Sequence, residues 1–121
     1  MTTLAEVLKR IGDVAEFCEG APADSNQRGL FDTYPLHVAA VWGDCEAIRI
    51  LVEAGARINQ RGEHGFTPLM EAVAQGHRDA ALLLIDLGAT AERNDGGDLP
   101  SEYARIAGND ELAGILAERG Y

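Results

Sequence analysis

The chain has little of several residue types that would mark other protein classes. Its 121 residues include two cysteines, one tryptophan and only 6% aromatic residues. Two thiols cannot build the disulfide framework of a small secreted domain, so we expect Cys18 and Cys45 to be free, buried side chains in a reducing, cytoplasmic setting. No apolar run reaches the roughly 20 residues of a membrane span. Residues 1–10 also lack the basic start and apolar stretch of a secretion signal.

Basic residues are scarce as well. Ten Lys and Arg residues stand against 20 Asp and Glu residues, which gives a net charge of -10. Such a surface repels nucleic acid and anionic membranes, so we expect neither as a partner. It favours fast association with a basic protein. Simple solubility is an equally good explanation of the charge, and the sequence leaves both open.

The chain is instead rich in an internal repeat. Residues 35–43 match residues 68–76 at an offset of 33, and a third copy follows at an offset of 32. In each copy a proline can open a first helix, and Gly43, Gly76 or Gly108 can end it. A second helix follows with one apolar face, which a single helix pair cannot bury unless neighbouring pairs stack on it. We predict helices at 3–11, 13–19, 35–42, 45–54, 68–75, 78–87, 100–107 and 110–118.

The period and its motifs resemble the ankyrin repeat, with Thr67-Pro68-Leu69 in one copy and Pro35-Leu36-His37 in another. The resemblance covers residues 32–121. It implies an all-α solenoid of stacked antiparallel helix pairs joined by short hairpin-like loops. It further implies one domain over residues 1–121: an N-terminal capping repeat with an irregular loop at 1–31, repeats at 32–61 and 62–93, and a C-terminal capping repeat at 94–121.

The loop before Pro35 departs from the pattern of the next one. Asp32 stands where the second copy has Gly65, a left-handed turn position, and Tyr34 replaces the helix-capping Thr67. The stretch from Gly20 to Pro35 is also two residues longer than the one from Gly55 to Pro68. We therefore predict a first loop unlike its neighbours, and loops that break a local rule are where function is expected.

The histidines and acidic residues do not form a catalytic or metal-binding pattern. The family resemblance implies that His37 bonds backbone between neighbouring repeats, while His64 should lie at a loop tip and His77 at a helix–helix turn. No His or Cys spacing suits zinc, and no nucleophile, base and orienting group occur together. We predict a protein that is not an enzyme, with no catalytic residues, no metal and no cofactor.

The ankyrin resemblance implies a binding surface on the first helices and loop tips, the concave face of the family. Trp42 ends a first helix, where it either packs between repeats or anchors a partner. We expect Phe31, Trp42 and Phe66 at the centre of the interface, with Arg61 and Gln75 supplying hydrogen bonds. The full set of expected partner-binding residues is Leu30, Phe31, Thr33, Val41, Trp42, Arg61, Glu63, His64, Phe66 and Gln75.

The function that the resemblance implies is binding to another protein. We expect a non-catalytic interaction module that is monomeric when free and takes a basic protein partner. An inhibitor or immunity-type neutraliser is one such role, supported by the acidity alone. An adaptor or regulatory subunit of a larger complex is the alternative, and an enzyme has the least support, because fold alone does not decide function.

Overall fold

A computed structural model describes residues 2–13 and 24–121. Within these ranges the chain is helical and has no strand, which confirms the predicted all-α class. The predicted helix at 13–19 lies, apart from Asp13, outside the described residues. The elements are α1 (Leu4–Ile11), η2 (Leu30–Asp32), α2 (Pro35–Trp42), α3 (Cys45–Glu53), η3 (Glu63–Gly65), α4 (Pro68–Ala74), α5 (Arg78–Asp86), α6 (Pro100–Ile106) and α7 (Asp110–Glu118).

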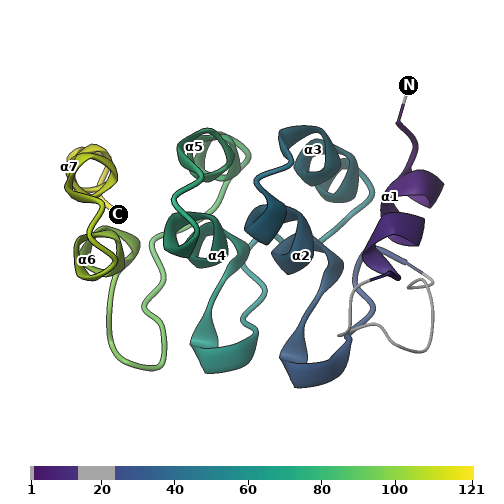
Figure 1. The fold of residues 1–121 in the computed structure, drawn as a ribbon, viewed down its shortest axis with the longest axis horizontal. Helices are drawn as coiled ribbons and strands as arrows, with labels where there is room; N and C mark the ends of the chain where they lie inside the picture. The colour runs from purple at the N-terminus through teal and green to yellow at the C-terminus, as the bar shows by residue number, and fades with distance from the viewer. Residues whose placement is uncertain (1, 14–23) are drawn as a thin grey trace.

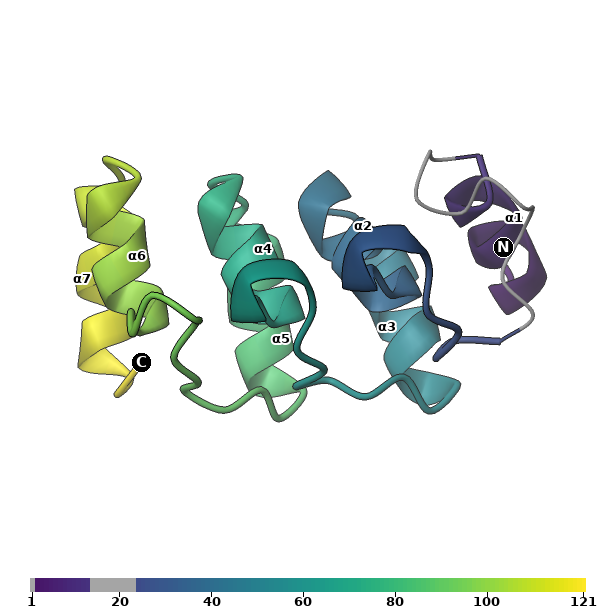
Figure 2. The same ribbon diagram turned by 90° about the horizontal axis from the view of Figure 1, so that it is seen from below.

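The helices lie in two rows (Figure 1). The first helices of the pairs, α2, α4 and α6, form one row, and their partners α3, α5 and α7 form the other. Each pair packs on the next through its first helix, α2 against α4 and α4 against α6, while α1 covers α2 and α3 at the N-terminal end. Figure 2, seen from the loop side, shows this side-by-side stacking. The result is a solenoid with the two chain ends at opposite ends of the stack.

Local signals in the sequence set where the helices begin and end. The Thr67 hydroxyl accepts a hydrogen bond from the backbone N–H of Met70 at 3.3 Å, which confirms the predicted cap of α4. Tyr34 occupies the same position before α2 and makes no capping hydrogen bond with its side chain, as predicted. Gly43 ends α2 with φ 69°, and a Cβ there would lie 2.6 Å from the His77 ring. Glycine is therefore required twice at this turn, by its backbone angle and by the closeness of His77.

The core is built from leucine, isoleucine and alanine between the two helix rows. Large side chains such as Leu36, Ile48 and Leu84 are at most 1% exposed. Each contributes about 1.5–3 kcal/mol by leaving water. Cys45 is free but only half-buried, so the prediction of a buried thiol is wrong for this residue. The reason is its place as the first residue of α3, at the turn that follows Gly43.

The first loop repeats the second from Asn26 onward. The Asn26 side chain accepts a hydrogen bond from the N–H of Arg57 at 3.0 Å, and Asn59, 33 residues on, accepts one from Thr90 at the same distance. The backbone closes both loops alike, from Gly29 N–H to the Thr33 carbonyl and from Gly62 N–H to the Phe66 carbonyl. The prediction of a first loop unlike its neighbours is therefore wrong from Asn26 onward, because the extra residues precede it.

One predicted departure within that loop is confirmed. Asp32 has φ 54°, in the left-handed region where Gly65 has φ 71°. An L-residue in this region costs roughly 1–2 kcal/mol relative to its preferred backbone angles. The Asp32 carboxylate lies 3.3 Å from the Arg28 guanidinium, but both side chains are mostly exposed. The ion pair therefore offsets little of that strain.

Candidate protein-binding face

The loop side of the first helix row carries a pocket between the first two repeats. We call the side of α2, α4 and α6 that borders the loop turns η2 and η3 the concave face. The pocket has a volume of about 200 Å³, smaller than most small-molecule sites. Both apolar and acidic side chains line it. The lining residues are Asp32, Thr33, His37, Val38, Val41, Trp42, Glu63 and Glu71.

Trp42 lies at one edge of this pocket and is half-buried. The guanidinium of Arg10, from α1, lies 4.9 Å from the centre of the indole ring. Arg10 is itself paired with Asp44 at 3.0 Å. The sequence left open whether Trp42 packs between repeats or is available to a partner, and the structure combines the two. The indole ring packs against Arg10 of α1, and Trp42 also lines the open pocket.

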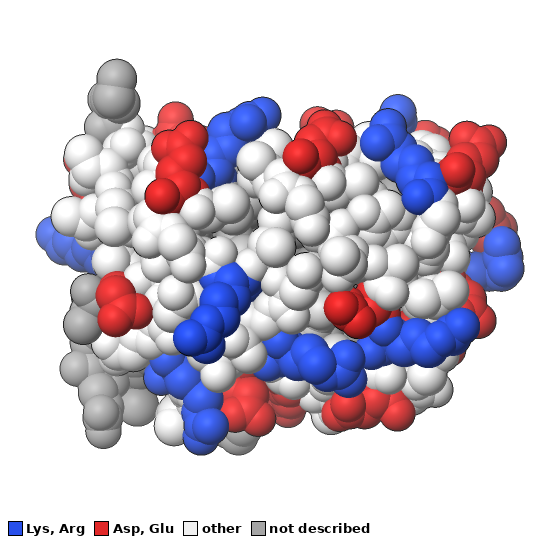
Figure 3. Space-filling view, turned by 180° about the vertical axis from the view of Figure 1, so that it is seen from behind, with Lys and Arg blue, Asp and Glu red and all other residues white. Residues whose placement is uncertain are grey.

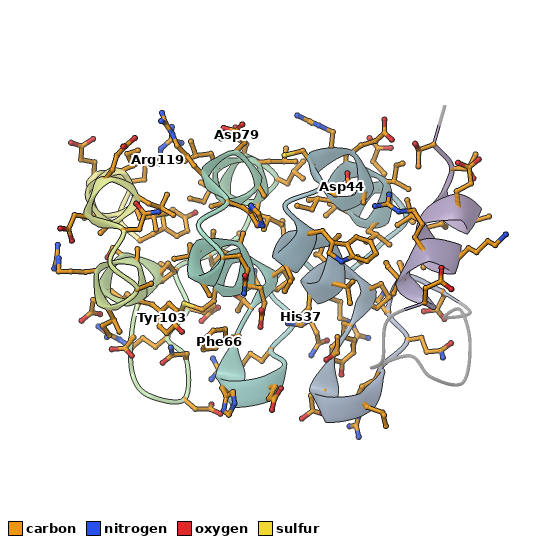
Figure 4. All side chains as sticks on the ribbon, viewed as in Figure 1. His37, Asp44, Phe66, Asp79, Tyr103 and Arg119 are labelled. Atoms are coloured by element: carbon orange, nitrogen blue, oxygen red, sulfur yellow. The ribbon has the colours of Figure 1, made fainter. Side chains whose placement is uncertain are left out.

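Phe66 is turned toward the third repeat. Its ring meets Tyr103 of α6 edge to face, with ring centroids 5.1 Å apart, and the two side chains lie next to each other in Figure 4. The second ring contact of Phe66 is with His64, at 6.4 Å. Phe66 does not line the pocket that holds Trp42. Phe31 belongs to η2, but its side chain lies outside the described part of the structure.

His37 links neighbouring repeats, as the family resemblance implied. Its Nε2–H donates to the Phe66 carbonyl at 2.9 Å, and the residue is 3% exposed. Burial lowers the pKa of His37, although the hydrogen-bonded carbonyl of Phe66 partly opposes this. Protonation would place a second N–H at Nδ1, which is buried and has no hydrogen-bond partner among the described residues. His37 is therefore a neutral, structural residue. His77 makes the matching link from Nε2 to the Val41 carbonyl at 2.8 Å, a bond that sequence reasoning missed.

A comparison with protein families agrees with this repeating geometry. A family model described as ankyrin repeats (3 copies) matches residues 5–95, well over half of the chain. The chain belongs to the ankyrin-repeat family. No curated protein sequence matches it significantly. Ankyrin repeats are protein–protein interaction modules and are typically non-catalytic, so binding to another protein is the general function of this ankyrin-repeat protein.

The other predicted site residues of the ankyrin-repeat protein fall into two groups. Thr33, Val41 and Glu63 line the pocket beside Trp42, and Leu30 is 51% exposed on η2. Arg61, by contrast, is occupied within the molecule. It donates to the Arg93 carbonyl at 2.7 Å and pairs with Asp95 at 3.0 Å, which ties the second loop to the third.

Two predicted residues are open to solvent. His64 is exposed on η3, with its Nε2 3.5 Å from a Glu63 carboxylate oxygen, and Gln75 is exposed where it caps α4. No cluster of three side chains that could hold a metal occurs in the described ranges, and none of the described helices is long and apolar enough to cross a membrane.

Sequence reasoning missed four of the pocket-lining residues, Asp32, His37, Val38 and Glu71, and Glu71 has the most perturbed environment among them. It lies on α4, where the neighbouring repeats place Val38 and Tyr103. Burial, together with the negative charge of Glu63, raises the pKa of Glu71 to about 7, against a smaller lowering effect of His64. Glu71 makes no ion pair with any described residue. The available signal was its position: a glutamate in a series that otherwise holds valine and tyrosine.

Proposed function

We propose that this ankyrin-repeat protein is a non-catalytic binding module whose concave face takes up a basic protein partner. The observation that supports this best is an exposed isoleucine. Ile106 is 67% exposed, and it occupies in α6 the repeat position that Val41 has in α2 and Ala74 in α4. Since Val41 lines the pocket, the series places apolar side chains along one face of all three pairs. A partner surface is the simplest reason for such a row.

The distribution of charge supports a basic partner. The pocket lining includes Asp32, Glu63 and Glu71, and the whole chain carries a net charge of -10. On the back of the molecule, arginine and acidic side chains lie next to one another (Figure 3). At the pocket, Glu71 makes no ion pair with any described residue. A positively charged partner would meet an attractive field there.

Within this proposal the protein acts in the cytoplasm as a monomer until it meets its partner. An inhibitor or immunity-type neutraliser of a basic protein fits a small acidic module, and the acidity is the support for it. The alternative is an adaptor or regulatory subunit of a larger assembly. The nature of the partner separates the two roles: a single basic toxin or nuclease supports neutralisation, and a multi-subunit assembly supports the adaptor.

The test is differential capture followed by affinity measurement. The parent protein, Trp42→Ala and Ile106→Ser are immobilised and incubated with native cell extract. Glu118→Gln, at an exposed position on α7, is the matched control. We expect a basic protein that the parent and the control retain and both concave-face variants lose. Calorimetry with the purified partner should then show about 2 kcal/mol or more lost for Trp42→Ala. A partner that binds all four proteins equally would contradict the proposal.

A further inference from the structure

The pocket between α2 and α4 has two features of a receptor for one long cationic side chain. Val38, Val41 and Trp42 offer apolar surface, on which the methylene stem of such a side chain packs well. Asp32, Glu63 and Glu71 line the same pocket and supply its carboxylates. A volume of about 200 Å³ suits a single side chain better than a drug-sized molecule.

The three carboxylates are not equally free to bind a cation. Asp32 lies 3.3 Å from Arg28, and Glu63 lies 3.5 Å from His64. Glu71 has no such neighbour among the described residues, and it is the most enclosed of the three, being half-buried where Asp32 and Glu63 are exposed. A half-buried carboxylate without a counter-ion is costly, so a cation delivered from outside would be stabilised most at Glu71.

We propose that this pocket receives one arginine side chain of the protein partner, with Glu71 as the carboxylate that pairs with its guanidinium. Arginine fits better than lysine because its planar group binds a carboxylate through two hydrogen bonds and stacks on aromatic rings such as that of Trp42. Arg10 already contacts this indole, but its charge is balanced by Asp44 at 3.0 Å. This inference rests on the proposed function, because it names the partner group that the concave face takes up.

The same geometry makes arginine binding depend on pH. Several other charged or titratable groups lie around Glu71. Asp32 of η2, His37 of α2 and Glu63 of η3 line the same pocket, and His64 of η3 acts on Glu71 through its charge. On α6, the nearest titratable group is the Tyr103 hydroxyl, whose ring packs against Phe66. The pKa of Glu71 is raised to about 7 in the free protein. If only its ionised form pairs with arginine, the apparent affinity should rise about tenfold between pH 6 and pH 8.

The test uses acetyl-arginine methylamide as the probe and the indole N–H signal of Trp42, the only tryptophan, as the readout. Acetyl-lysine methylamide and the uncharged acetyl-citrulline methylamide are the comparison ligands, at matched ionic strength. We expect saturable arginine binding with a Kd on the order of 1 mM at pH 8. We expect lysine to bind more weakly and citrulline to give no saturable shift. Glu71→Gln should weaken arginine binding about tenfold and remove its pH dependence, while Glu118→Gln keeps both.

Equal responses to arginine and citrulline, tighter binding of lysine, an unchanged Glu71→Gln variant, or no saturable shift would each overturn the inference. Circular dichroism of every variant checks that it is folded. The outcome is separable from that of the proposed function. If arginine fails to bind while Trp42→Ala still loses the partner, only the arginine pocket is wrong. If arginine binds at Glu71 but no concave-face variant loses the partner, the proposed function is wrong.

Discussion

Replacing Glu71 with glutamine should stabilise the protein at alkaline pH and much less at acidic pH. The folded state raises the pKa of Glu71 from 4.5 to about 7. Between these two values the folded chain therefore holds a proton that the unfolded chain has released. Stability then falls as pH rises through this window, because the ionised carboxylate is better solvated in the unfolded chain. Glutamine keeps the shape of the side chain and cannot ionise.

The size of the effect follows from the pKa difference. A shift from 4.5 to about 7 corresponds to roughly 3 kcal/mol at full ionisation, at 1.36 kcal/mol per pKa unit. Near pH 5 part of the unfolded-state titration has already occurred, which leaves about 2 kcal/mol between pH 5 and pH 8. Glu71→Gln should therefore raise the free energy of unfolding by about 2 kcal/mol more near pH 8 than near pH 5.

Urea unfolding at the two pH values measures this difference. Trp42 fluorescence and far-ultraviolet circular dichroism should give coincident transitions, which supports two-state treatment. Glu118→Gln, on an exposed position of α7, is the control and should change little at either pH. A Glu71→Gln variant equally stabilised at both pH values would refute the reasoning, because the gain would then come from packing and not from the carboxyl charge. A variant with no gain near pH 8 would refute it too.

Three further perturbations test other parts of the structure. His37→Ala should lower the free energy of unfolding by about 1–3 kcal/mol, since it removes the bond to the Phe66 carbonyl, and unchanged stability in urea would contradict the structural role. Asp32→Gly should raise it by about 1 kcal/mol by relieving the left-handed backbone, and an equal or lower value would contradict that account. The association rate with a basic partner, measured by stopped flow, should fall steeply as salt rises, since the Debye length falls from about 10 Å at 0.1 M to about 3 Å at 1 M. Association rates that do not change with salt would contradict the role of charge in binding.

Much of the fold could be predicted from the sequence because the repeat carries its own register. Prolines and glycines at a fixed spacing placed the helices α2 to α7 within a residue of their observed ends, whereas the short turns η2 and η3 were not predicted as helical. Thr67 and His37 could be assigned roles because each acts through backbone groups whose positions the repeat determines. Sequence periodicity supplies that information directly.

The site was less predictable because it depends on which way side chains turn. The spacing of the repeat motifs did not show that the Phe66 ring would pack against Tyr103. It also did not show that the Arg61 guanidinium would bind Asp95 and the Arg93 carbonyl within the molecule. The environment of Glu71 also depends on burial by its neighbours, which a repeat pattern does not describe. The regularity of the first loop was also missed. The two loops were compared by their lengths from Gly20 and Gly55, and this comparison did not reveal that Asn26 and Asn59 make equivalent hydrogen bonds.

The most direct test of concave-face binding compares matched variants on two faces of the molecule. Trp42→Ala alters the pocket edge, and Asp79→Ala alters an exposed position in the first turn of α5, on the outer row (Figure 4). The measurement is the affinity of each folded variant for the purified partner, by calorimetry. Binding through the concave face predicts a loss of about 2 kcal/mol or more for Trp42→Ala and little change for Asp79→Ala. Parent-like binding by Trp42→Ala with weakened binding by Asp79→Ala would contradict it and point to the acidic outer helices around Glu46, Glu53, Asp79 and Asp86.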